Sequence, residues 1–105
     1  MKMYNAIVDA VVRSSKLTKI RMVIPCGTAV QNARTTILGD RMTRDGYHLH
    51  RTYGRYVAAC TWYEKIFRKN VVGNSYLPDG MTEEERLAAQ ESAHAAVRKP
   101  LKVTK

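Results

Sequence analysis

The segment Ile20-Arg21-Met22-Val23-Ile24 is the one clear β-strand that the sequence predicts, and a single strand cannot form a sheet. The segment is short and β-prone, and it ends at Pro25 and Gly27, which break regular structure. Both edges of a strand carry backbone N–H and C=O groups that need partners, and a lone strand leaves these groups unpaired. We therefore expect this strand to pair with a second copy of the chain or with another part of a larger protein.

Three helices are predicted around this strand. The first covers residues 3–14, where apolar residues recur at spacings of three and four. The second covers residues 53–69 and is apolar on two adjacent faces. The third covers residues 82–98, because Thr82 and the glutamate three positions later fit a capping box. Residues 25–52 show no sustained period and are predicted to form a long ordered loop with at most a short helical turn, a kind of segment that often carries function.

The length and composition indicate one small domain. With 105 residues, 45% of them hydrophobic, the chain can bury one core, and disordered and collagen-like classes are excluded. No apolar run approaches the roughly 20 residues of a membrane span, and Asp9 interrupts the run near Met1, which argues against a signal peptide. Cys26 and Cys60 match no metal-binding or redox spacing, so we expect reduced thiols and neither metal nor cofactor. A cytoplasmic location is expected for this chain, with a secreted parent protein left open.

The net charge raises the question of nucleic acid binding. Eighteen Lys and Arg residues against nine Asp and Glu residues give a formal charge of +9. This excess is spread along the chain and matches no nucleic-acid-binding motif, so nucleic acid is not the expected partner. A non-catalytic module that is oligomeric, or that binds nucleic acid through its basic surface, remains the alternative.

Asp45 and His48 are the candidate catalytic residues in the predicted loop. They stand three positions apart, and Gly46 between them can turn the backbone. The carboxylate of Asp45 can then accept the Nδ1–H of His48, which leaves Nε2 as a general base toward a hydroxyl. Tyr47 lies between them and is a candidate substrate contact. The alternative is a structural loop, in which Asp45 makes only a local turn bond and His48 packs or caps.

A family resemblance rests on four segments. They are Asp45-Gly46-Tyr47-His48-Leu49, Tyr53-Gly54-Arg55-Tyr56, the helical residues 57–64, and residues 24–34 before them. Together they resemble the last conserved block of the SGNH (GDSL-type) hydrolases, and the likeness extends over about residues 3–100. The resemblance implies a flavodoxin-like three-layer α/β/α sandwich. It also implies that this block supplies the Asp and His of a Ser-His-Asp triad that cleaves esters, often acetyl groups on carbohydrates.

The chain departs from that pattern at the nucleophile. No Gly-Asp-Ser block is present, since Gly39-Asp40 is followed by Arg41. None of the four serines stands in a strand-to-helix elbow that would expose a nucleophile.

The resulting prediction is a single partial domain over residues 1–105. It is the C-terminal part of an α/β sandwich, with the last strand, a catalytic loop over residues 25–52, and helices over residues 53–69 and 82–98. We expect a truncated, esterase-like chain that carries Asp45 and His48 and is inactive alone. Its expected partners are an ester substrate, such as an acetylated carbohydrate, and a second copy or a complementing N-terminal segment; no membrane is expected.

Overall fold

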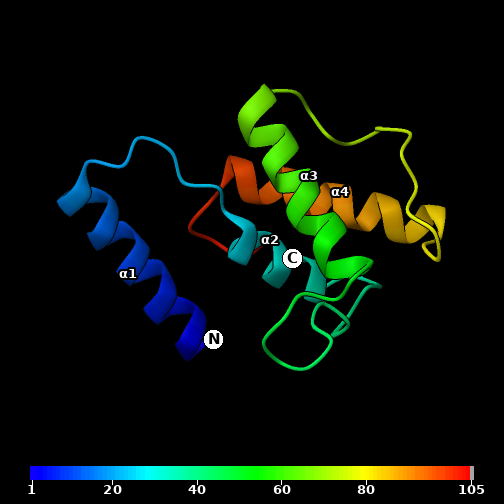
Figure 1. Ribbon diagram of the computed structural model, residues 1–105, viewed down its shortest axis with the longest axis horizontal. Coiled ribbons are helices and arrows are strands. Elements are labelled where there is room, and N and C mark those ends of the chain that lie inside the picture. Colours follow the sequence, from blue (N-terminus) through cyan, green and yellow to red (C-terminus); the bar gives the residue numbers. More distant parts are fainter. Residues whose placement is uncertain (105) are drawn as a thin grey trace.

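The computed structural model describes residues 1–104 and is helical (Figure 1). Within residues 1–104, the β pairing consists of an isolated antiparallel bridge between Thr43 and Leu49. The predicted α/β sandwich is therefore wrong for the described residues, which form no sheet. The helices are α1 (Lys2–Thr18), α2 (Cys26–Arg34), α3 (Tyr53–Phe67) and α4 (Glu83–Arg98).

The predicted strand over residues 20–24 is instead an irregular connection between α1 and α2. Lys19 ends α1 in the left-handed conformation, with φ 53°. The backbone N–H of Ile20 then donates to the Ser15 carbonyl at 3.1 Å, and the N–H of Cys26 donates to the Ile24 carbonyl at 2.8 Å. No other described segment lies beside residues 20–24 as a strand. The β-prone sequence has no neighbour to pair with, so it forms no strand here.

The predicted loop over residues 25–52 contains helix α2, which has nine residues where at most a short helical turn was expected. Thr28, Ala29, Asn32 and Ala33 are buried, and their spacing places them on one face of the helix. This face is made of small and polar side chains, so it does not show as a stripe of large apolar residues. The remainder of the loop does lack regular helix or strand, as predicted.

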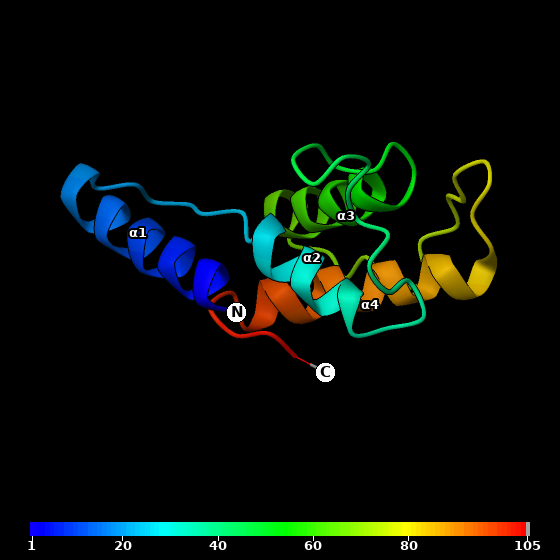
Figure 2. The same cartoon turned by 90° about the horizontal axis from the view of Figure 1, so that it is seen from below.

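Helices α2, α3 and α4 pack together around a core rich in alanine (Figure 2). Small side chains at the contacts let helix backbones approach closely, so little volume is needed to fill the space between them. Larger side chains from the loop and from α3 complete the interior. The fully buried hydrophobic residues are Ala29, Ala33, Leu38, Val57, Ala89, Ala93 and Ala96.

Helix α4 begins at the predicted capping box. The N–H of Glu85 donates to the Thr82 hydroxyl at 3.1 Å, and the Glu85 carboxylate accepts the Thr82 N–H at 2.9 Å. The Thr82 N–H holds the pKa of Glu85 below its usual value, with Arg41 contributing in the same direction. The cap therefore fixes where α4 starts.

Helix α1 lies to one side of the other three helices (Figure 2). Tyr4 is its only buried residue. The hydroxyl of Tyr4 lies 2.8 Å from that of Thr28, and Thr28 donates its proton to the Pro100 carbonyl at 2.7 Å. Tyr4 is therefore the donor in its own bond. None of the described helices is long and apolar enough to cross a membrane.

Candidate functional site

The candidate residues lie in a tight loop just before α3. The His50 N–H donates to the Met42 carbonyl at 2.7 Å, and the Arg44 N–H donates to the His48 carbonyl at 3.0 Å. These bonds flank the bridge between residues 43 and 49 and close a hairpin-like turn. Gly54 at the start of α3 lies directly against this base, because a Cβ there would collide with the Met42 carbonyl. A side chain at position 54 would thus push α3 away from the turn.

The turn brings Asp45 and His48 together. Gly46 takes φ 88°, a conformation that side chains disfavour. One carboxylate oxygen of Asp45 accepts the backbone N–H groups of His48 at 2.7 Å and Tyr47 at 2.9 Å. The other oxygen lies 2.6 Å from His48 Nδ1. The local turn bond and the bond to the ring, which were alternatives from the sequence, therefore occur together.

The hydrogen bonds set the charge of Asp45 and the tautomer of His48. The backbone N–H of His48, its ring and the N–H of Tyr47 hold the pKa of Asp45 below its usual value. An ionised carboxylate can only accept, so Nδ1 of His48 carries the proton and Nε2 of the neutral ring is an acceptor. Nε2 makes no hydrogen bond to any residue from 1 to 104. It is therefore free to take a proton from another group.

The pair is open to solvent. The side chains of His48 and Asp45 are 63% and 46% exposed, and Tyr47 between them is 92% exposed. Tyr47, predicted to contact substrate, thus stands beside the pair without lining an enclosed pocket. The position next to His48 is different, because Leu49 lines a groove that runs toward α1.

Arg41 fixes the loop to α3 and α4. Its guanidinium donates to a Glu85 carboxylate oxygen at 2.8 Å and to the Leu38 carbonyl at 2.9 Å. It also lies 4.6 Å from the centre of the Tyr53 ring, a cation–π distance. His50 secures the start of α3, since its Nδ1 accepts the backbone N–H groups of residues 52 and 53. These contacts hold the loop that carries the candidate residues against α3 and α4.

The described residues place no nucleophile beside His48. The hydroxyls of Ser15 and Ser92 donate to the carbonyls one turn earlier in their own helices, and no serine bonds His48. Burial raises the pKa of the Cys60 thiol to about 11 and that of Cys26 above its usual value, so neither is a thiolate at neutral pH. Residues 1–104 also hold no group of three side chains suited to a metal ion.

A second carboxylate–imidazole pair was not predicted. Glu64 on α3 is 6% exposed, and its carboxylate lies 2.8 Å from Nδ1 of His94 on α4. The same carboxylate accepts the Val71 N–H at 2.9 Å. The side chain of His94 is 28% exposed and is thus only partly open to solvent. The sequence signal for this pair is Glu64 itself, an acidic residue on the apolar face of α3, because a buried carboxylate needs a partner.

Two comparisons place the chain among known proteins. Residues 1–96 match the family "Domain of unknown function (DUF4886)". The chain is also similar to the crystal structure of a DUF4886 family protein from Bacteroides uniformis ATCC 8492, with 54% sequence identity and a TM-score of 0.96. This alignment covers 99% of the chain and 40% of that protein. No curated protein matches.

These findings correct the family assignment. They give no indication of an SGNH or GDSL hydrolase, so the resemblance is wrong, as are the hydrolase and α/β classifications that came with it. The chain spans less than half the length of the solved protein that it matches. The extent and identity of the match are sufficient to assign a family: the chain belongs to the DUF4886 family.

Proposed function

We propose that Asp45 and His48 form the general-base pair of an ester-cleaving site whose nucleophile lies outside the described residues. The observation that carries the proposal is the 2.6 Å contact between Asp45 and His48 Nδ1, with Nε2 unbonded.

The chemistry follows from the tautomer. Nε2 of His48 removes the proton of a hydroxyl as its oxygen attacks the ester carbonyl, and the ring becomes an imidazolium. Asp45 stabilises that cation and keeps the ring oriented. In the second step, the imidazolium gives the proton to the leaving alkoxide as the intermediate collapses to an acylated nucleophile. A water molecule then hydrolyses this acyl group, with Nε2 of His48 again taking and returning the proton. Asp45 suits this role because its low pKa keeps it ionised near neutral pH.

The described chain lacks the other half of such a site. It provides no hydroxyl against Nε2 and no enclosed pocket around the pair, so we expect the isolated chain to hydrolyse esters at background rates. The solved relative has more than half of its length outside the match. That unmatched part is the proposed source of the nucleophile and of the donors that stabilise the oxyanion.

The test is a chimera in which this chain replaces the matching part of the relative. Its hydrolysis of p-nitrophenyl acetate is compared with that of variants His48→Ala and Asp45→Asn. Loss of a general base lowers rates by about 10²–10⁴-fold, so His48→Ala should lower kcat/KM by at least about 10²-fold. Asp40→Asn is the matched control, since Asp40 is also an exposed loop aspartate and contacts only Arg34, at 3.1 Å.

The proposal fails if the chimera shows no saturable turnover above background, or if His48→Ala leaves the turnover unchanged. It also fails if the isolated chain turns over ester and loses this activity with His48→Ala, because the nucleophile would then lie within the described residues.

Nucleic acid binding without catalysis is the second candidate, and one groove favours it. Arg21, Lys65, Arg68 and Lys69 line a hollow of about 420 Å³ at the end of α3. Such a basic hollow suits a phosphate backbone. A mobility-shift assay with RNA and DNA should show binding that weakens with salt and with the double variant Arg68→Ala/Lys69→Ala. The absence of any shift at low salt would remove this candidate.

A further inference from the structure

Helix α1 presents an apolar face that the described residues leave uncovered. Met3 is 75% exposed and Ile7 is 51% exposed, although both lie on the same helical face as the buried Tyr4. Val8, Val11 and Val12 continue this face and are half-buried. A 17-residue helix with one buried residue gains little from its own packing. The apolar face of α1 can therefore pack against apolar side chains from outside the described residues.

The connection after α1 is also without a partner. Ile20, Met22 and Val23 are 51%, 49% and 38% exposed. The backbone N–H groups of residues 21–23 donate no hydrogen bond to any acceptor among residues 1–104. Four of the five residues from 20 to 24 are apolar, which is typical of a strand that is covered on both faces of a sheet. The sequence of residues 20–24 is therefore typical of a strand inside a sheet, but the backbone N–H groups of residues 21–23 have no partner among the described residues.

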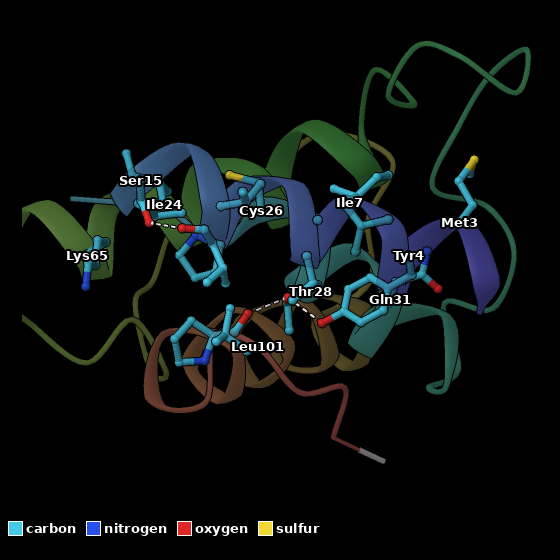
Figure 3. A pocket seen from close by; sticks show the side chains of 18 of the residues that line it. Met3, Tyr4, Ile7, Ser15, Ile24, Cys26, Thr28, Gln31, Lys65 and Leu101 are labelled. Carbon is cyan, nitrogen blue, oxygen red and sulfur yellow. Dashed lines mark hydrogen bonds between the residues drawn. The ribbon is translucent and has the colours of Figure 1, made fainter. Parts of the chain in front are cut away.

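These two features border one groove (Figure 3). The groove has a volume of about 540 Å³ and lies between α1, the connection and the start of α2. Its apolar lining comes from α1, the connection, α2 and the C-terminal segment, and includes Ile7, Val11, Ile24, Val30 and Leu101. The groove also reaches Leu49, next to His48.

The relative indicates what fills the groove. A TM-score of 0.96 over 99% of this chain requires that α1 lie in the same place in the solved protein, because a displaced 17-residue helix would lower the score. That protein keeps α1 apart from the other helices while having more than half of its chain outside the match. The groove of this chain is open, and the longer relative has additional chain that can pack against the same surfaces.

We propose that the groove and residues 20–24 are the docking surface for the part of the DUF4886 protein that this chain does not match. The docked polypeptide covers the α1 face with apolar side chains and pairs as a β-strand with residues 20–24. This unmatched part is the occupant in either case, whether it is joined to this chain in one longer polypeptide or is a separate polypeptide. This assembly holds whether or not Asp45 and His48 catalyse, and its tests measure no activity.

Amide hydrogen exchange tests the pairing. Residues 21–23 should exchange fast in the isolated chain and at least about 10²-fold more slowly in the chimera with the unmatched part of the relative, since ladder hydrogen bonds protect amides. The intact relative is a second arm that does not depend on the chimera. Its amides aligned with residues 21–23 should be protected to the same degree. Fast exchange in the intact relative would overturn the proposal.

Substitutions on α1 test the groove. In the chimera, Ile7→Asp with Val11→Asp should lower the melting temperature by about 5 °C or more, because two carboxylates would be buried. Leu17→Asp is the matched control, since Leu17 is on the same helix, is 83% exposed and does not line the groove. Equal effects of both changes would overturn the proposal. So would a dimer of the isolated chain that protects residues 21–23, which would make a second copy the occupant.

Discussion

Replacing Gln90 with leucine is expected to destabilise the three-helix core. Gln90 on α4 is 1% exposed. Its amide nitrogen donates to the Tyr56 hydroxyl at 3.0 Å and to the Asn74 carbonyl at 2.8 Å. Its amide oxygen accepts the Gly73 N–H at 3.0 Å. One side chain thus ties α4 to α3 and to the connection between these helices.

The magnitude follows from the bonds lost. A buried hydrogen bond contributes about 1 kcal/mol net, and the groups left without a partner cost at least that much. Leucine is apolar and fills the space, so the cavity contribution is small. The Tyr56 hydroxyl keeps its bond to the Tyr76 carbonyl at 3.2 Å, but the Gly73 N–H loses its partner. We therefore expect the free energy of unfolding to fall by about 3 kcal/mol.

Urea unfolding, followed by far-ultraviolet circular dichroism, measures this loss. Gln31→Leu is the matched control, because the Gln31 side chain has one hydrogen bond, which it accepts from Arg34 at 3.2 Å in an exposed position. Its effect should stay below about 0.5 kcal/mol. A loss at Gln90 of less than about 1 kcal/mol would refute the reasoning, because the network would then contribute no more than a surface pair.

Three further substitutions or treatments have defined outcomes. Thr82→Ala should lower the free energy of unfolding by about 1 kcal/mol by removing the α4 cap, as thermal melting will show. Gly54→Ala should cost about 2 kcal/mol or more and shift the NMR signals of the turn, because the new methyl group meets the Met42 carbonyl. Iodoacetamide at pH 8 should spare Cys60, whose pKa is raised to about 11, until the chain unfolds, while half-buried Cys26 reacts faster.

The elements that local chemistry determines could be predicted from the sequence. The start of α4 depends on Thr82 and Glu85, three positions apart, and the structure contains that cap. The contact between Asp45 and His48 is equally local, because a three-residue turn brings the two side chains together. The contact is present in the structure, and its catalytic role remains a proposal.

The elements that depend on distant partners could not be predicted. The buried face of α2 consists of small and polar residues such as Ala29 and Asn32, so its burial depends on α3 and α4 rather than on its own hydrophobicity. Glu64 and His94 stand 30 positions apart, and no local pattern joins them. Residues 53–69 are apolar on two adjacent faces, yet Trp62 on α3 is 52% exposed, because the described residues do not surround α3 on all sides.

The tautomer of the His48 ring is the most direct test of the proposed function. Long-range ¹H–¹⁵N NMR of the neutral ring reports which nitrogen carries the proton. The 2.6 Å contact with Asp45 predicts a proton on Nδ1, with Nε2 as the free acceptor, and loss of this preference in Asp45→Asn. A proton on Nε2, or a tautomer that Asp45→Asn leaves unchanged, would contradict the account, because the ring would then have no base to offer a nucleophile.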